Sequence, residues 1–356
     1  MRIPTMINRC RFLVLLLFSL VFPLSAAQAA PLPKGERTLG LAVQPAQDGD
    51  YGHALALAQG TGVQSVTLAL DWSRLEPAQG RYDNTLLTIA DSFYPSRHIA
   101  IDLVLRPINT SRLEVPADLR DKPFDDPAVI ARFERLLDDV FAQTPHLTLN
   151  SLVLGNEVDA YLGQDTARWP QYQAFYQAVR AYARAKRPGL KVGVGATFDG
   201  LTGASRLPLQ ALNSVSDLIV ATYYPLNPDF TVRAPSVSGP DLMRLCDLYS
   251  HRPVSLIEAG YPSSPDCGSS PAKQAAFVQS LFAAWDAHAA QIVSATLSWQ
   301  TDVPPAAVAG LTHYYGVSTR PFAAFLGSLG LRTYPGTGQD KPAFVALKKE
   351  AQVRGW

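Results

Sequence analysis

Apolar runs that alternate with amphipathic stretches restrict the fold of this chain more than any other feature. Most of these runs are continuously apolar, which is typical of parallel strands buried on both faces. We expect eight strands, at Thr38–Val43, Ser65–Trp72, His98–Ile108, Leu149–Glu157, Leu190–Phe198, Ser216–Pro225, Pro253–Gly260 and Ala295–Trp299. Eight strand–helix repeats predict an α/β fold, a closed (β/α)8 or TIM barrel, as a single domain over residues 30–356. A doubly wound open sheet is the alternative, because its elements alternate in the same way.

The stretches between the strands carry apolar residues at helical spacing. The clearest are Asp126–Gln143, Trp169–Lys186, Pro240–Ser250 and Pro271–His288, and a last helix is expected at Ala343–Val353. Asp126-Pro127 and Ser270-Pro271 each place a capping residue directly before a proline at the first helical position, which is typical of a helix start.

The first 29 residues have the pattern of a secretory signal. Positively charged residues precede the apolar stretch Phe12 to Phe22, and Ala27-Gln28-Ala29 provides a small-residue cleavage site. The apolar stretch is shorter than a typical membrane-spanning helix. We therefore predict a signal peptide over residues 1–29 and a periplasmic or secreted protein with no stable membrane anchor. An uncleaved anchor is the alternative.

The charge balance and the metal-binding residue types restrict the possible ligands. Lysines and arginines number 31 and aspartates and glutamates 30, for a formal net charge of +1. Such a chain offers no electrostatic reason to bind nucleic acid or an anionic membrane, so we expect an uncharged ligand and a monomer. The histidines lack metal-ligand spacing and no Cys-x-x-Cys occurs, so no metal and no cofactor are expected. Cys246 and Cys267 either form a disulfide or remain two unpaired thiols; both possibilities stay open.

Two glutamates follow predicted strands, in the sequences Leu152-Val153-Leu154-Gly155-Asn156-Glu157 and Val254-Ser255-Leu256-Ile257-Glu258. The C-terminal ends of barrel strands meet at one mouth, where functional side chains collect. Hydrolysis of a glycosidic bond needs two carboxyl groups beside the sugar, one as a proton donor and one as a nucleophile or base. We therefore predict that Glu157 and Glu258 are catalytic. An isolated Asn-Glu pair that only fixes a turn is the structural alternative.

The order of polar residues along the strands resembles clan A of the glycoside hydrolases. Asn156-Glu157 follows the fourth strand, Tyr224 the sixth, Glu258 the seventh and Trp299 the eighth. The resemblance implies that Glu157 is the acid/base and Glu258 the nucleophile of a retaining enzyme. It also implies that Asn156 binds the sugar 2-hydroxyl, that Tyr224 orients the nucleophile, and that Trp299 stacks under the sugar.

A narrower similarity joins Tyr223-Tyr224-Pro225 and Glu258-Ala259-Gly260-Tyr261-Pro262 to family 53, the endo-β-1,4-galactanases. One feature departs from the clan: the arginine often found on the second strand is missing. Arg106, at the end of the third strand, is the candidate to compensate. Asp71 is a candidate to bind a sugar hydroxyl, and the alternative is a cap of the turn that begins at Ser73.

The resemblance implies a hydrolase acting on a β-linked, neutral polysaccharide or oligosaccharide, and we expect it to cleave internal bonds. The alternative is a carbohydrate-binding barrel that has lost catalysis. The presence of both glutamates favours the enzyme, whereas the missing arginine favours the binding protein.

Overall fold

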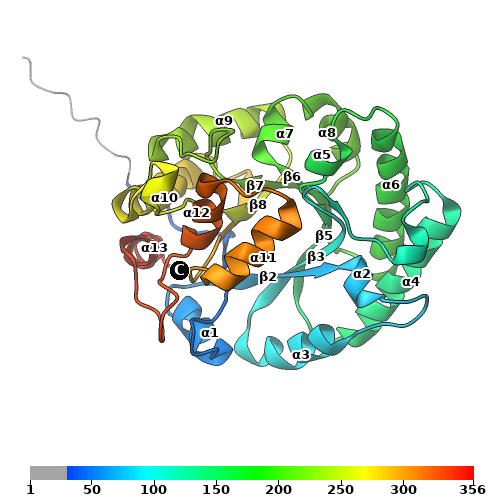
Figure 1. Ribbon diagram of the computed structural model, residues 1–356, viewed down its shortest axis with the longest axis horizontal. Helices are drawn as coiled ribbons and strands as arrows, with labels where there is room; N and C mark the ends of the chain where they lie inside the picture. The colour runs from blue at the N-terminus through cyan, green and yellow to red at the C-terminus, as the bar shows by residue number, and fades with distance from the viewer. Residues whose placement is uncertain (1–29) are drawn as a thin grey trace, which may run out of the picture. The chain divides into compact units, whose positions relative to one another are not determined.

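Eight parallel strands form a closed barrel in the computed structural model, which describes residues 30–356 (Figure 1). The barrel strands are β1 (Thr38–Leu41), β2 (Ser65–Asp71), β3 (Ala100–Asn109), β5 (Leu149–Asn156), β6 (Val192–Thr197), β7 (Ile219–Tyr223), β8 (Val254–Ala259) and β9 (Ile292–Leu297). They pair in the order β2-β1-β9-β8-β7-β6-β5-β3, and pairing of β2 with β3 closes the ring. The predicted TIM barrel is confirmed and the open sheet is excluded. The predicted signal over residues 1–29 lies outside the described residues.

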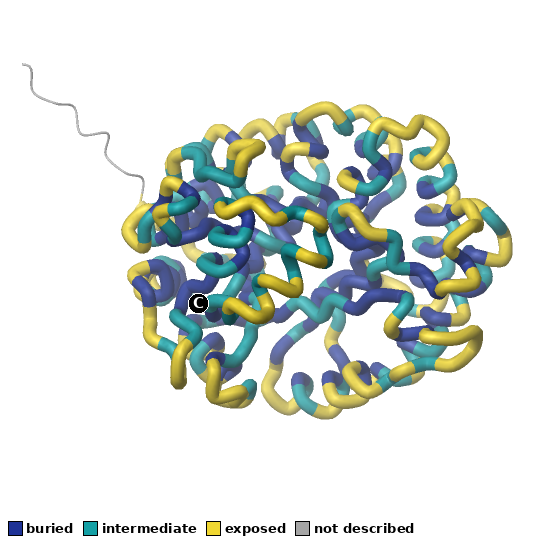
Figure 2. Tube along the Cα trace, viewed as in Figure 1, coloured by how far each residue is buried: buried dark blue, intermediate teal, exposed yellow. Residues whose placement is uncertain are grey.

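Helices surround the barrel and bury their apolar sides against it (Figures 1 and 2). They are α1 (Tyr51–Gln59), α2 (Trp72–Leu75), α3 (Thr85–Phe93), α4 (Pro127–Gln143), α5 (Val158–Leu162), α6 (Arg168–Lys186), α7 (Phe198–Thr202), α8 (Arg206–Asn213), α9 (Ser238–Leu248), α10 (Pro271–Ala287), α11 (Pro305–Tyr315), α12 (Arg320–Ser328) and α13 (Pro342–Gln352). The expected caps are present, because Asp126 accepts from the Ala128 amide and Ser270 from the Lys273 amide. None of the helices in residues 30–356 has the length and apolarity needed to cross a membrane.

The inside of the barrel is apolar in the middle and polar at both ends. Alternate residues of a strand point inward, so Asp102, Val104 and Arg106 of β3 lie at successive levels. Val104 packs with apolar residues of three other strands in the middle level. At the lower level the Ser151 hydroxyl donates a hydrogen bond of 2.7 Å to Asp102. The charged residues at the C-terminal level form the floor of the mouth.

The end of β5 depends on Gly155. Its φ of 76° lies in the left-handed region, and a Cβ added there would come within 2.5 Å of Val158 Cγ1 and 2.6 Å of the Tyr172 hydroxyl oxygen. We expect Gly155→Ala to lower the free energy of unfolding by about 3 kcal/mol, because it adds backbone strain to a steric clash. Urea denaturation measures the change. Gly163→Ala is the matched control, since Gly163 also has a positive φ but has no atom within 4 Å of the added Cβ; equal losses in both variants would refute the clash.

The connection from β9 to α13 contains two helices that the sequence analysis did not anticipate. Phe322, Phe325 and Leu326 of α12 pack into a separate apolar cluster with Leu329. α11 has no buried residue. It lies in front of the barrel in Figure 1, and its trace is exposed or half-buried along its length in Figure 2.

Cys246 and Cys267, the two cysteines within residues 30–356, are unpaired and buried. Cys246 belongs to the main core through α9, whereas Cys267 packs with the α12 cluster. The Cys267 thiol donates to the Pro321 carbonyl oxygen at 3.4 Å. The disulfide considered from the sequence is therefore not formed, because the two side chains belong to different packing clusters.

Candidate active site

Glu157 stands directly after β5, with a backbone conformation in the left-handed region (φ 48°, ψ 46°). Such a conformation is uncommon for residues other than glycine and is often found at functional sites. Two threonine hydroxyls hold its carboxylate: Thr110 donates to Oε2 and Thr222 to Oε1, each at 2.7 Å. Since these threonines follow β3 and belong to β7, the glutamate is fixed from both sides.

Glu258 lies on β8 and accepts a hydrogen bond of 2.7 Å from the Tyr224 hydroxyl. The neighbouring Tyr223 instead donates to Asp241, so Tyr224 is the tyrosine that faces the glutamate. Gly260 makes this approach possible, because a Cβ there would lie 2.6 Å from Tyr224 Cε1 and 2.6 Å from the Ser298 carbonyl oxygen. Its φ is not positive, so close packing rather than a tight turn requires this glycine.

The two glutamates interact electrostatically. Burial, followed by the negative charge of Glu157, raises the pKa of Glu258 from 4.5 to about 7, against the opposing effects of the Tyr224 hydrogen bond and of Arg106. The reasoning from sequence expected the tyrosine to favour the charged form of Glu258. In the structure the tyrosine does lower the pKa, but burial and the second carboxylate outweigh it.

This shift predicts a pH-dependent gain in stability for Glu258→Gln. Because the folded protein holds the Glu258 proton more tightly than the unfolded chain, wild type loses stability as pH rises from about 4.5 to about 7. We expect the variant to be more stable by on the order of 2 kcal/mol at pH 8 and equally stable at pH 4. Denaturant titrations at both pH values measure the difference. An equal difference at the two pH values would contradict the electrostatic origin.

Asp71 and Arg106 are paired with each other at the C-terminal level of β2 and β3. Arg106 Nε lies 2.8 Å from Asp71 Oδ1, and Arg74 Nε lies 3.4 Å from the other oxygen. Burial raises the pKa of Asp71, whereas the charge of Arg106 opposes this. Arg106 also lowers the pKa of Glu258, so its positive charge acts on the predicted site. Asp71 makes no capping hydrogen bond to the turn at Ser73.

Asn156 and Trp299 occupy the predicted strand ends. Asn156 is buried at the end of β5, and its side-chain nitrogen lies 3.4 Å from Asn109 Oδ1. Trp299 follows β9 after a cis peptide bond and packs, half-buried, against the cluster that contains Tyr224. Contacts with a sugar remain predictions for both residues.

Reasoning from sequence missed four residues near the carboxylates. Thr110 and Thr222 hold Glu157, and their positions at strand ends were the available signal. Tyr314 and Tyr315, at the end of α11, contact the mouth from a helix that was not anticipated. Burial, with the charges of Glu157 and Glu258, raises the pKa of Tyr315 to about 12.

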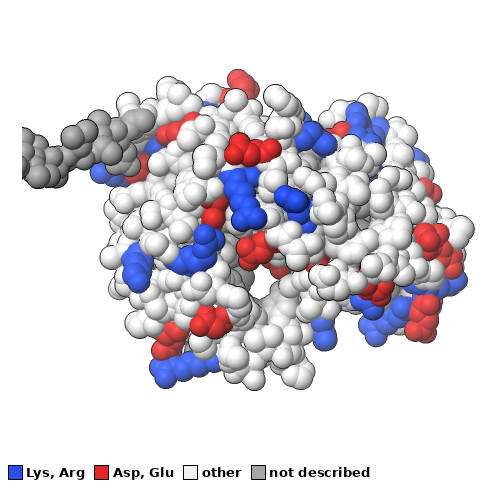
Figure 3. All heavy atoms as spheres, turned by 90° about the horizontal axis from the view of Figure 1, so that it is seen from above, with Lys and Arg blue, Asp and Glu red and all other residues white. Residues whose placement is uncertain are grey.

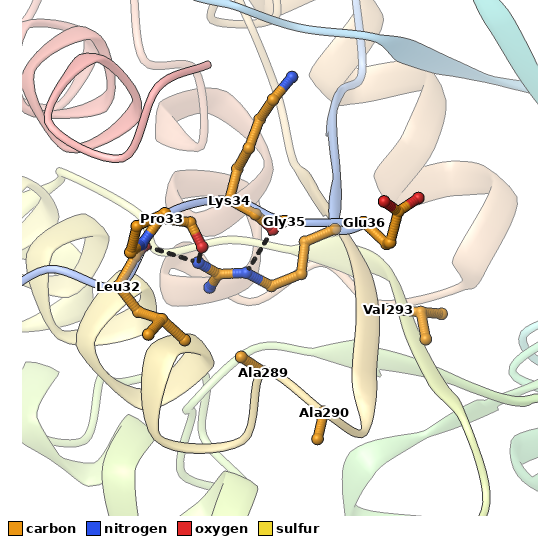
Figure 4. Close-up of a pocket in the computed structure, with 9 residues that line it drawn as sticks. Leu32, Pro33, Lys34, Gly35, Glu36, Ala289, Ala290 and Val293 are labelled. Carbon is orange, nitrogen blue, oxygen red and sulfur yellow. Dashed lines mark hydrogen bonds between the residues drawn. The ribbon is translucent and has the colours of Figure 1, made fainter.

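A pocket lies at the N-terminal ends of β1 and β9, opposite the mouth. Its volume is about 350 Å³, and it is lined by Leu32 to Arg37, Ala289, Ala290 and Val293 (Figure 4). The Arg37 guanidinium donates to the Leu32 and Pro33 carbonyl oxygens, so its charged group is already engaged. Positive and negative side chains are interspersed among uncharged ones on the face seen in Figure 3. Among residues 30–356, no three His, Cys, Asp or Glu side chains gather as metal ligands.

Comparisons with known proteins relate this barrel to glycoside hydrolases by fold. No family model and no curated protein matches the sequence. The exo-β-1,4-mannosidase Op5Man5 from Opitutaceae bacterium strain TAV5 superposes with a TM-score of 0.67 at 19% identity, over 89% of this chain and 59% of that enzyme. A GH5_18 protein from Streptomyces cattleya, in complex with Manβ1-4GlcNAc, gives 0.67 at 15% identity, over 89% and 80% of the two chains. A family 39 glycoside hydrolase from Bacteroides cellulosilyticus WH2 gives 0.61 at 17%, over 90% and 64%.

The superpositions show that this chain and these enzymes share a fold, and the sequence identities of 15–19% support no closer relationship. The similarity to family 53 finds no support among the comparisons. The resemblance to clan A drawn from the order of strand-end residues is confirmed at the level of the barrel: this chain has the fold of the clan A glycoside hydrolases.

Proposed function

We propose that this protein is a retaining glycoside hydrolase that acts on a β-linked, neutral polysaccharide or oligosaccharide. One observation carries the proposal: two glutamates from β5 and β8 interact at one barrel mouth, and each is held by hydroxyl donors from neighbouring strands. The predicted signal in residues 1–29 supports action outside the cytoplasm, where polysaccharides are encountered.

In the proposed reaction, the Glu258 carboxylate attacks the anomeric carbon while Glu157 donates its proton to the departing oxygen. A covalent glycosyl–enzyme and a free alcohol result. Glu157 then removes a proton from water as the water oxygen attacks the anomeric carbon, which releases the sugar and restores both glutamates. Tyr224 holds the Glu258 oxygen that does not attack, and Arg106 offsets part of the negative charge.

The raised pKa of Glu258 suggests the opposite assignment of the acid/base and nucleophile roles. The raised pKa of Glu258 favours Glu258 as the acid, with Glu157 as the nucleophile. The Tyr224 donor and the order of residues shared with clan A favour the first assignment. A coupled pair shares its proton, and a bound sugar changes the burial of both groups. The assignment is therefore decided by variants of the two residues, described in the Discussion.

A panel of activated aryl β-glycosides tests the function. The structural neighbours suggest starting with β-mannosides, Manβ1-4GlcNAc and β-glucosides, followed by purified neutral polysaccharides. Nuclear magnetic resonance of the first product identifies its anomer, and retention of the β configuration is expected. Product sizes distinguish internal from terminal cleavage. Binding without turnover across the panel would instead support a carbohydrate-binding barrel that has lost catalysis, and an inverted product would refute the retaining mechanism.

A further inference from the structure

A hydrogen-bond chain runs from α11 to the residue beside Glu157. The Tyr314 hydroxyl donates to Glu114 Oε1 at 2.6 Å and accepts from Asn109 Nδ2 at 3.1 Å. Asn109 Oδ1 in turn faces Asn156 Nδ2 at 3.4 Å. Residues from the β9–α13 connection are therefore linked through the end of β3 to the end of β5.

The direction of each hydrogen bond is fixed by chemistry. An ionised carboxylate only accepts, so the single Tyr314 proton goes to Glu114 and the phenol oxygen is left to accept. Asn109 must then turn its NH₂ group toward Tyr314 and its carbonyl oxygen toward Asn156. This arrangement requires Asn156 to present its NH₂ group to Asn109, which sets the orientation of the Asn156 amide.

Glu114 provides a firm base for this chain. Its second oxygen accepts from the Ser73 hydroxyl at 2.8 Å, and its carbonyl oxygen accepts from the Ser73 amide at 2.8 Å. The Arg112 guanidinium lies 5.1 Å from the centre of the Tyr314 ring, a favourable cation–π distance. Arg112 belongs to β4 (Arg112–Leu113), Glu114 directly follows this strand, and Ser73 lies on α2.

α11 is held in two ways, by this anchor at its C-terminal end and by apolar contacts with the α12 cluster. No residue of α11 is buried. Val308 and Leu311 are half-buried against the α12 cluster. At the end of the helix the Tyr314 and Tyr315 rings pack edge to face at 4.9 Å, and Tyr315 packs against Phe322 of α12 at 6.0 Å. Docking of Tyr314 also brings the Tyr315 ring near both glutamates, whose charges contribute to raising its pKa.

We propose that Tyr314 is a positioning residue: its docking on Glu114 and Asn109 seats α11 at the barrel mouth and orients the Asn156 amide toward the sugar 2-hydroxyl. The inference rests on the proposed glycosidase function and adds a role for a helix outside the barrel. Tyr314 touches no reacting atom in this scheme. Its effect on the rate passes through Asn109 to the interaction that Asn156 makes with the 2-hydroxyl, whereas its effect on α11 is to hold the helix in place.

Tyr314→Phe tests the proposal, because it removes the hydroxyl and keeps the ring. We expect kcat/KM for an aryl β-glycoside to fall on the order of 10-fold, the scale of one or two lost hydrogen bonds. The matched 2-deoxy glycoside, which lacks the Asn156 partner, should lose less than about 2-fold. Tyr182→Phe is the matched control, since Tyr182 also donates to a carboxylate at 2.6 Å, from α6 to Asp138 on α4, with no link to the mouth; it should leave both rates unchanged.

Hydrogen exchange supplies a measurement that does not depend on turnover. In Tyr314→Phe, amides of residues 305–316 should exchange faster than in wild type, whereas those of the barrel strands should not. Equal losses on the 2-hydroxyl and 2-deoxy substrates, or unchanged exchange in α11, would overturn the proposal. If wild type hydrolyses no glycoside, the proposed function fails by itself, and the exchange measurement still decides whether Tyr314 seats α11.

Discussion

Glu258→Ala abolishes hydrolysis of activated and natural substrates alike, if Glu258 is the nucleophile. The reason is that no covalent intermediate forms without this carboxylate, however good the leaving group. We expect a loss in kcat on the order of 10²- to 10⁴-fold, measured with an aryl β-glycoside. Azide fits the space left by the carboxylate and attacks the anomeric carbon from that side. The azide product should therefore have the inverted configuration.

Direct labelling provides an independent check of Glu258. A 2-deoxy-2-fluoro glycoside with a good leaving group should accumulate as a glycosyl–enzyme, and digestion should place the added mass on the peptide that contains Glu258. Glu36→Ala is the control for removal of a carboxylate, because Glu36 is exposed and lines the pocket at the opposite end of the strands. Label on Glu157 would reverse the two roles, in line with the raised pKa of Glu258.

Glu157→Ala should separate the two steps of the reaction. A good leaving group needs little protonation, so the first step should stay within about 10-fold of wild type for a dinitrophenyl glycoside. Natural glycosides, whose leaving group must be protonated, should lose on the order of 10²- to 10⁴-fold. The second step lacks its base, so the glycosyl–enzyme should accumulate and give a burst of phenol.

Added azide should accelerate this variant, because an anion needs no general base, and the product should retain the β configuration. The conservative variant Glu157→Gln should show the same dependence on leaving group, since it also lacks the proton. Equal losses for good and poor leaving groups would contradict an acid/base role for Glu157. Full activity in the alanine variant of either glutamate would reject the assignment as a whole.

The barrel could be predicted from the sequence because the pattern of an apolar run followed by an amphipathic stretch is repeated eight times. Eight apolar runs each indicated a strand buried on both faces, as in a closed barrel or a doubly wound sheet. The pairing of β2 with β3 then decided for the barrel. The order of strand ends then brought Glu157 and Glu258 to one mouth. Tyr224 also contacts Glu258 as the resemblance implied. These features depend on strand number and residue alternation, which a sequence displays directly.

The remaining features depend on contacts between distant segments. Thr110, directly after β3, and Thr222, on β7, hold Glu157. Their places at strand ends bring them to the mouth, but the sequence does not show which side chain each one contacts. The opposing effects on the pKa of Glu258 required its burial to be known. The residues of α11 are mostly apolar but are not separated onto one helix face, so no amphipathic signal marks the helix and Tyr314 and Tyr315 were not placed at the mouth. Asp71 and Arg106 are candidates to bind a sugar, and their mutual ion pair is visible only in three dimensions.

Most of α11 is exposed to solvent, and this exposure affects which residues beside the barrel mouth can change during evolution. α11 contributes no fully buried residue, and its apolar contacts with the α12 cluster come from Val308, Leu311 and Tyr315. Substitutions at its exposed positions therefore leave the free energy of unfolding nearly unchanged. Substitutions at the C-terminal ends of the barrel strands are more costly, because the side chains there are packed and charged. Selection can therefore vary the exposed residues of α11 while the hydrogen bond between Tyr314 and Asn109 is kept. A library confined to the exposed positions 305–307, 309, 310 and 313 changes the surface of α11 without approaching the stability threshold that limits changes in the strands.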